Sequence, residues 1–291
     1  MKLARFEIDG RTALGAVIED GIVSLAAVGG HFPDMTTLIA EGDAALERIR
    51  QLIRGVPPHH ALDDVRLLAP LRPGKYLAIG MNYAKHVAEM GHADRPQHQY
   101  WFNKQTTCIN GPFDPIDPGV TTMLDYEVEL GVVIGRTAKH VAAADALGHV
   151  FGYLVANDVS ARDWQRHTPT FTMGKSFDSH GPIGPWIVTA DEIPDPQALD
   201  LRCLVNGEVR QHSNTAGMSF GIAEQIEYLT TAFTLEPGDL IATGTPEGVG
   251  AAMDPPGFLK PGDVVRCEIE RIGVIENWIA TPSAWAAGGG S

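Results

Sequence analysis

Residues 123–135 read MLDYEVELGVVIG, and the alternation in this stretch decides how the chain folds. Successive side chains of a β-strand point to opposite faces, so this pattern predicts one strand with two different faces. The apolar face carries Tyr126, Val128, Leu130, Val132 and Ile134. The opposite face carries Asp125, Glu127, Glu129 and Gly131. The stretch therefore predicts a strand that packs on a core through one face and concentrates carboxylates on the other.

Strands are also predicted for most of the chain beyond residue 75. Asn206-Gly207 is typical of a tight β-hairpin, and Pro-Gly-Asp turns at 237–239 and 261–263 each precede a β-rich run. One helix is predicted from a stripe of apolar residues, Phe220, Ala223, Ile226, Leu229 and Phe233. Many strands with few helices indicate an α+β, β-rich protein with a mixed, mostly antiparallel sheet, roll or barrel, and argue against a doubly wound fold.

The N-terminal residues form a pattern of their own. Turn residues at Asp9-Gly10 and Asp20-Gly21 indicate a small antiparallel sheet, and apolar residues at helical spacing predict a helix over 36–54. A proline-rich stretch at 56–73 follows. We expect a small N-terminal α+β domain at 1–68, a larger domain at 69–282, and a flexible tail or expression remnant at 283–291.

The composition excludes several function classes. Lys and Arg number 22 against 36 Asp and Glu, a net charge of −14, which repels nucleic acid and anionic lipid surfaces. The first residues lack the apolar core of a signal peptide, and no apolar run reaches the roughly 18 residues of a membrane span. Three widely spaced cysteines predict buried thiols and no disulfide. We therefore expect a cytoplasmic protein.

Glu127 and Glu129 have two explanations. They could form the charged outer face of a half-buried strand. Alternatively, a spacing of two places both carboxylates on one face within about 7 Å, close enough to share a cation that removes their repulsion. Asp158 ends the apolar run GYLVAND and could be a third ligand or a helix cap. Three carboxylates without His or Cys ligands would favour Mg²⁺ or Mn²⁺.

Positive side chains should offset the negative charge of such a cluster. Candidates are Lys104, Arg162 and Lys175, although each could equally form an ordinary surface ion pair. The glycine-rich loop TGTPEGVG at 243–250 could bring backbone close to a ligand, with Thr245 donating to a substrate carboxylate, or could be a tight structural loop.

A short helix is predicted at 82–91, NYAKHVAEMG, with Asn82 as its N-cap. His86 and Glu89 lie three residues apart on one helical face. They could form a surface pair, or a dyad in which Glu89 orients His86 to take a proton from water. The polar stretch that follows, GHADRPQHQYW, is predicted to be a lid.

Six motifs in order give the chain a resemblance to the fumarylacetoacetate hydrolase family, over about residues 70–280. They are GMNYAKHVAEMG, DYEVELGVVIG, GYLVANDVSARDWQ, GKSFDSHGPIGPW, the NGE hairpin and TGTPEGVG. The resemblance implies that family's mixed β-roll, a metal held by Glu127, Glu129 and Asp158, and a lid with His86 and Glu89. It implies a homodimer, and a three-carboxylate site like that of the acylpyruvate hydrolases. The substrate contacts that it implies are Lys175, Thr245, Arg162, Gln165, Lys104 and Tyr83.

The resemblance also implies an activity. The expected reaction is metal-dependent hydrolysis of a carbon–carbon bond in a β-diketone acid such as an acylpyruvate or fumarylpyruvate, as in aromatic catabolism. The expected partner is thus a small anionic oxo-acid. The same site could instead decarboxylate oxaloacetate, or isomerise or tautomerise a hydroxydienedioate. A non-enzymatic alternative is a protein in which the carboxylates bind a structural divalent cation.

Overall fold

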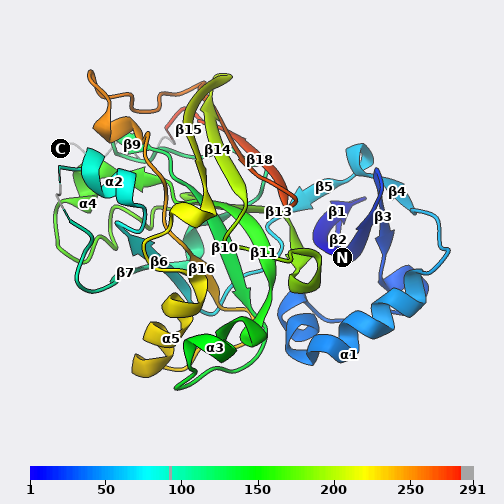
Figure 1. Cartoon of the computed structure of the whole chain (residues 1–291). Coiled ribbons are helices and arrows are strands. Elements are labelled where there is room, and N and C mark those ends of the chain that lie inside the picture. Colours follow the sequence, from blue (N-terminus) through cyan, green and yellow to red (C-terminus); the bar gives the residue numbers. More distant parts are fainter. Residues whose placement is uncertain (92–93, 283–291) are drawn as a thin grey trace.

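A computed structural model describes residues 1–91 and 94–282, and strands dominate this part of the chain. The predicted tail at 283–291 and residues 92–93 of the predicted lid lie outside the described residues. Figure 1 shows a small N-terminal part, with β1 to β5 and α1, beside a larger β-rich body. The β-rich fold class predicted from the sequence is confirmed.

One large sheet runs through both parts of the molecule. Most of its pairs are antiparallel, but β16 pairs with β6 and β13 pairs with β8 in parallel, so the sheet is mixed. Its path ends at two edge strands, so within the described residues the sheet is open. In sheet order the strands are β4 (His60–Ala61), β3 (Gly21–Ser24), β2 (Arg11–Ile18), β1 (Lys2–Ile8), β13 (Gly181–Thr189), β11 (Val150–Asn157), β10 (Val128–Ile134), β16 (Leu240–Ala242), β6 (Tyr76–Gly80) and β7 (Tyr100–Lys104). Beside this path, β5 (Arg66–Leu68) pairs with β1, and β8 (Ile109–Asn110) pairs with β13.

Two smaller sheets complete the strands. The four-stranded sheet has the order β15 (Glu208–Asn214), β14 (Asp200–Val205), β17 (Val264–Ile269) and β18 (Gly273–Trp278). Its β14–β15 hairpin turns at Asn206 and Gly207, whose φ angles of 52° and 81° are the left-handed values that this turn requires. A two-stranded sheet joins β9 (Leu124–Asp125) to β12 (Ser160–Ala161). Residues 123–135 thus form two strands, β9 and β10, and not the single strand predicted.

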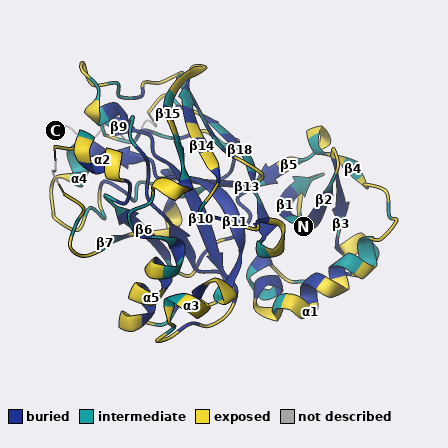
Figure 2. Cartoon of the chain, in the orientation of Figure 1, coloured by how far each residue is buried: buried dark blue, intermediate teal, exposed yellow. Residues whose placement is uncertain are grey.

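The predicted apolar face of β10 packs on the four-stranded sheet. Leu130 and Val132 belong to the same buried cluster as Leu201 and Val265 of β14 and β17. The opposite face of β10 is buried as well, since Val133 belongs to a second core together with α1. Figure 2 accordingly shows β10 and β11 in the colour of buried residues. A strand buried on both faces explains why the carboxylates of this segment cannot be a solvated outer surface.

The N-terminal part is joined to the body through the large sheet. Lys2 and Leu3 of β1 pair with Val188 and Ile187 of β13, so hydrogen bonds cross between the two parts. The predicted helix is α1 (Met35–Ile53), which Asp34 caps and which kinks at Gly42, where φ is 59°. The division of the chain at residue 68 stays a prediction.

The remaining helices are short. They are α2 (Ala84–Glu89), α3 (Ala143–Ala146), α4 (Arg162–Gln165) and α5 (Ile222–Ala232). The prediction that Asn82 caps α2 is wrong. Its side chain donates to the carbonyl oxygens of Phe220 and Thr243 and accepts from the Phe220 N–H, so it joins distant segments. Phe233 lies beyond the end of α5 and is exposed, so it does not extend the predicted apolar stripe.

The structure bears on two predictions that were made from the composition, one on the cysteines and one on membrane spans. Cys108, Cys203 and Cys267 are free and buried, as predicted. No helix in the described part of the chain combines the length and apolar character needed to cross a bilayer.

Candidate active site

Glu127, Glu129 and Asp158 meet where β10 begins and β11 ends. The two strands pair in antiparallel register, Val128 opposite Asn157, which puts the residues flanking this pair side by side. A backbone hydrogen bond of 2.9 Å from Asp158 N–H to Glu127 O fixes the junction. One carboxylate oxygen from each of the three residues lies within 4.8 Å of the others, and all three side chains are buried. The strand pairing therefore builds the three-carboxylate cluster that the sequence predicted.

Two buried lysines contact this cluster. Lys175 Nζ donates to Glu127 Oε2 and to Asp158 Oδ2, each at 2.7 Å. Lys104 Nζ donates to Asp158 Oδ1 at 2.6 Å and to the Val159 carbonyl at 3.3 Å. Both lysines come from other parts of the chain, Lys104 from the end of β7 and Lys175 from the loop before β13. The structure thus brings Lys104 and Lys175 to the carboxylates, where the sequence left their surroundings open.

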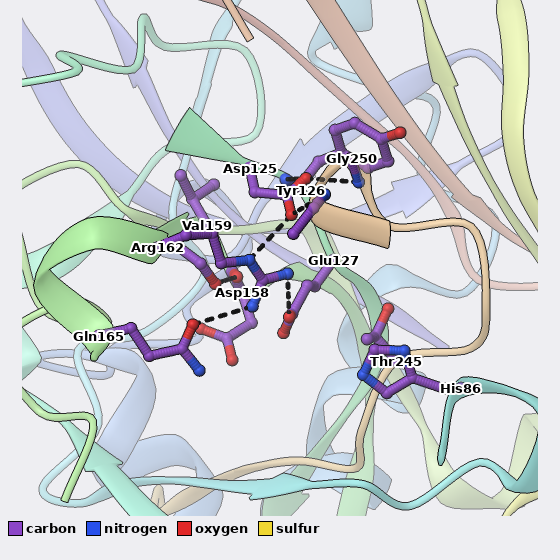
Figure 3. Close-up of polar contacts among 12 residues, drawn as sticks. His86, Asp125, Tyr126, Glu127, Asp158, Val159, Arg162, Gln165, Thr245 and Gly250 are labelled. Atoms are coloured by element: carbon purple, nitrogen blue, oxygen red, sulfur yellow. Dashed lines mark hydrogen bonds and ion pairs between the residues drawn. The ribbon is translucent and has the colours of Figure 1, made fainter. Parts of the chain in front are cut away.

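Arg162 connects the cluster to a neighbouring loop. Its guanidinium lies 2.6 Å from Glu127 Oε1, donates to Asp125 Oδ2 at 2.8 Å and donates to Gln165 Oε1 at 3.0 Å. Figure 3 shows Arg162 between these three partners. Asp125 is fully buried and also accepts from the N–H groups of Gly250 and Ala251.

Asp125 was not singled out as a site residue from the sequence. Its position on the carboxylate face of residues 123–135 was the available signal, because it shares the parity of Glu127 and Glu129.

Glu127 and Glu129 are in different electrostatic states. Burial alone would raise the pKa of Glu127, but the charges of Lys175 and Arg162 outweigh it and lower this pKa to about 2. Burial raises the pKa of Glu129 well above its usual value, and the charges of Asp158 and Glu127 raise it further. Glu129 accepts a hydrogen bond of 2.7 Å from Gly244 N–H, but within the described residues it has no ion pair. A negative charge on Glu129 therefore needs another cation.

The donor set suits a hard divalent cation. Carboxylate oxygens are the ligands that Mg²⁺ and Mn²⁺ prefer. Two oxygens on opposite sides of a cation at about 2.1 Å would be separated by about 4.2 Å, which is close to the 4.8 Å spread of this cluster. The residues present therefore fit a metal site, in which Glu129 is the ligand without an ion pair among the described residues.

His86 and Glu89 of α2 are in contact. His86 Nδ1 lies 2.7 Å from Glu89 Oε1, and Glu89 Oε2 accepts from Gly248 N–H at 2.9 Å. Because a carboxylate can only accept here, Nδ1 carries the proton, and Nε2 is the nitrogen left to act as a base. The carboxylate of Glu89 is thus fixed from both sides, and it in turn fixes the His86 ring.

A cavity of about 500 Å³ unites these groups. The predicted site residues that line it are His86, Glu127, Glu129, Arg162, Gln165, Lys175 and Thr245. The apolar part of its wall includes Met90, Tyr100, Phe102 and Phe171. The cavity therefore places a candidate base, two carboxylates of the cluster and cationic side chains around one space.

Three predicted substrate contacts are placed differently from the rest. Lys104 pairs with Asp158 and is not among the residues that line the cavity. Tyr83 is buried and is not among the residues that line the cavity. The Thr245 hydroxyl donates to the Val128 carbonyl at 3.0 Å and accepts from Gln211 Nε2 at 2.8 Å, so its proton is already engaged. Roles for these three residues in substrate binding stay predictions.

Comparisons with known proteins agree with this geometry. Residues 75–280 match the family described as fumarylacetoacetate (FAA) hydrolase C-terminal. The protein named oxaloacetate tautomerase FAHD2A, mitochondrial, of Bos taurus is 44% identical over 262 residues, which cover 88% of this chain and 83% of that protein.

Two solved structures are similar over nearly the whole chain. Maleylpyruvate hydrolase from Sphingobium sp. SYK-6, in complex with manganese(II) ion and pyruvate, has a TM-score of 0.80 at 33% identity and covers 97% of this chain and 100% of that chain. The 5-carboxymethyl-2-hydroxymuconate delta-isomerase from Mycobacterium smegmatis has a TM-score of 0.76 at 36% identity and covers 96% of this chain and 99% of that chain.

Proposed function

Because this chain belongs to the fumarylacetoacetate hydrolase family, we propose that it is a divalent-metal-dependent hydrolase acting on a β-diketone acid of the acylpyruvate type. The bond that breaks joins the acyl carbon to the methylene carbon of pyruvate. Water supplies a hydroxyl to the acyl carbon and a proton to the departing carbon, so the products are a carboxylic acid and pyruvate.

The carboxylate cluster supports a place for the 2-oxo acid end of the substrate. Glu127, Glu129 and Asp158 would hold Mg²⁺ or Mn²⁺, which when bound supplies a Lewis acid that stabilises negative charge on the 2-oxo acid. The similar maleylpyruvate hydrolase was solved with manganese(II) and pyruvate, which supports this assignment. Lys175 stands beside the same carboxylates, and its ammonium would stabilise negative charge that develops on the substrate oxygen.

The dyad of His86 and Glu89 is the part of the site that would activate water for hydrolysis. His86 lines the same cavity as Glu127 and Glu129, and its Nδ1 is held by Glu89 at 2.7 Å. With Nδ1 protonated, Nε2 can accept a proton from a water molecule in the cavity. The joint presence of this oriented base and two carboxylates of the cluster, Glu127 and Glu129, in one cavity is the observation on which the proposal rests.

A second candidate activity uses the same residues without attacking water. The 44% identity to an oxaloacetate tautomerase and the likeness to a muconate isomerase favour proton transfer on an enolisable oxo-acid. In that reaction His86 would move a proton between substrate atoms. Decarboxylation of oxaloacetate would likewise need the 2-oxo acid site and no water.

A substrate screen separates these activities. The protein is incubated with an acylpyruvate, with oxaloacetate and with a hydroxydienedioate, each with Mg²⁺, Mn²⁺ or a chelator. Hydrolysis predicts two carboxylic acids from the acylpyruvate, in a reaction that stops with the chelator and resumes when metal is returned.

Other results of the screen would replace the proposal. Turnover of oxaloacetate or the hydroxydienedioate alone would favour the second candidate. A melting temperature that rises with Mg²⁺, with no turnover of any substrate, would favour a structural cation site.

A further inference from the structure

Arg166 is the cation of the cavity wall that has no ion-pair partner among the described residues. Within the described residues its guanidinium makes no ion pair, whereas Arg162 and Lys175 are each paired with carboxylates of the cluster. Arg166 is exposed, yet it lines the cavity. A free guanidinium at the wall of a substrate cavity can bind an anionic group of the ligand.

Arg166 stands one helical turn away from the cluster. Arg162 begins α4, and Arg166 follows the helix with φ of −82° and ψ of −7°, which keeps the helical direction. Residues four apart lie on one helical face, separated by about 6 Å along the axis. Arg162 is buried against Glu127, whereas Arg166 is exposed. Arg166 therefore faces the part of the cavity that is nearer to solvent.

The chain that follows Arg166 is held against β7. The Phe171 ring lies 5.3 Å from that of Tyr100 and 5.9 Å from that of Phe102, and the Tyr100 hydroxyl donates to the Pro169 carbonyl at 3.3 Å. These three aromatic residues line the same cavity as Arg166 and the carboxylates Glu127 and Glu129. A substrate that reaches from the cluster to Arg166 would thus place a carbon chain against apolar rings and an anionic group at the guanidinium.

We propose that Arg166 binds a second carboxylate, so that the site selects 2-oxo dicarboxylic acids over 2-oxo monocarboxylic acids. This inference rests on the proposed function for the position of the 2-oxo acid end at the carboxylate cluster. A guanidinium can donate two parallel hydrogen bonds to a carboxylate, which favours Arg166 over the paired cations for this role.

Asp94 is an exposed acidic residue of the cavity lining, and its charge opposes an anionic ligand. It is exposed, lines the cavity and makes no ion pair with Arg166. Its negative charge should weaken the attraction of Arg166 for a carboxylate. Neutralising Asp94 should therefore tighten the binding of a dicarboxylic acid and leave a monocarboxylic acid less affected.

Binding of a matched pair of acids tests the proposal without relying on turnover. 2-Oxohexanedioate and 2-oxohexanoate have equal chain lengths and differ in the terminal carboxylate, and neither is a β-diketone. We expect isothermal titration in excess Mg²⁺ to show roughly tenfold tighter binding of the diacid. Arg166→Gln should remove this difference by weakening the diacid alone, Arg166→Lys should keep part of it, and Asp94→Asn should enlarge it.

The control is Arg11→Gln, which neutralises an exposed arginine at the start of β2, outside the cavity. Equal affinities of the wild type for the two acids, or an equal loss of both in Arg166→Gln, would overturn the inference. If the diacid preference depends on Arg166 but acylpyruvates are not hydrolysed, the proposed hydrolase activity fails and the inference stands. If neither acid binds, both fail.

Discussion

Lys175, which lines the cavity, is joined to the buried Asp158, with Nζ of Lys175 2.7 Å from Oδ2 of Asp158. The same ammonium lies 2.7 Å from Glu127 Oε2. Lys175 therefore neutralises two of the three carboxylates that would hold a metal ion. The protein can keep these carboxylates together before a metal binds, whereas Glu129 has no ion pair within the described residues and its pKa is raised by burial.

Lys175→Met should make the stability of the protein depend on a divalent cation. Removing one partner of a buried ion pair typically costs about 3–5 kcal/mol, since the other charge stays buried without a partner. We therefore expect a clear fall of the melting temperature in chelator, and a larger rise on adding Mg²⁺ than the wild type shows.

The matched control is Lys139→Met, because Lys139 is exposed and donates to the Thr231 carbonyl away from the site. Equal melting temperatures of Lys175→Met and wild type in chelator would show that the ammonium does not hold the cluster together.

Glu129→Gln should change how stability depends on pH. Because the pKa of Glu129 is raised in the folded protein, its stabilising contribution is present below the ordinary glutamate pKa of about 4.3 and is lost as pH rises through the raised value. The neutral amide lacks this titration. In chelator, the free energy of unfolding of the variant, measured in urea, should thus rise relative to that of the wild type as pH increases above the ordinary glutamate pKa of about 4.3.

The same variant should respond less to metal. Glutamine keeps an oxygen that can accept from Gly244 N–H, but it removes a negative charge from the donor set. The rise in melting temperature on adding Mg²⁺ should be smaller than in the wild type. Parallel pH profiles for the two proteins would contradict the electrostatic state described for Glu129.

His86→Ala should lower turnover and spare the metal site. General-base catalysis contributes about 10²- to 10⁴-fold to rates, so kcat should fall within that range on whichever substrate the screen identifies. The Mg²⁺-dependent rise in melting temperature should persist, because His86 is not part of the carboxylate cluster. His31→Ala, an exposed histidine of the N-terminal part, is the control. An unchanged kcat in His86→Ala would remove the dyad from the mechanism.

The sequence predicted the strands better than it predicted their surroundings. Alternation identified the two faces of β10 correctly, because side-chain direction in a strand is a local property. It could not show that both faces are buried, since the coverings are α1 and the four-stranded sheet, which lie far away in the sequence. Asn82 shows the same limit: its cap pattern was local, whereas its partners Phe220 and Thr243 are not.

Prediction of the site was limited in the same way, because local patterns identified residues but not their distant contacts. Glu127 and Glu129 share a face by spacing, and Asp158 ends a strand, so their convergence needed only the pairing of β10 with β11. The ion pairs of Lys104 and Lys175 depend on loops whose paths no local pattern specifies. Asp125 was missed for a related reason. In the sequence it looks like any carboxylate at the end of a strand, and only the distant groups that donate hydrogen bonds to it distinguish it.

Asp125→Asn should destabilise the protein although it changes few atoms. Oδ1 accepts from the N–H groups of Tyr126 and Gly250, and Oδ2 accepts from Ala251 N–H and Arg162 Nε–H. An amide has one oxygen, so its NH₂ group must face two of these donors and the charge of Arg162 loses a buried partner. We expect a loss of about 3–5 kcal/mol in the free energy of unfolding.

Urea unfolding with an unchanged m-value would measure this loss. Asp43→Asn is the matched control, because Asp43 pairs with Arg136 at the surface, where such pairs contribute at most about 1 kcal/mol. Since Ala251 lines the cavity and Arg162 contacts Glu127, the variant should also bind 2-oxo acids more weakly. If Asp125→Asn were as stable as the control, contacts other than this carboxylate would hold Arg162 and the backbone at Gly250 and Ala251 in place.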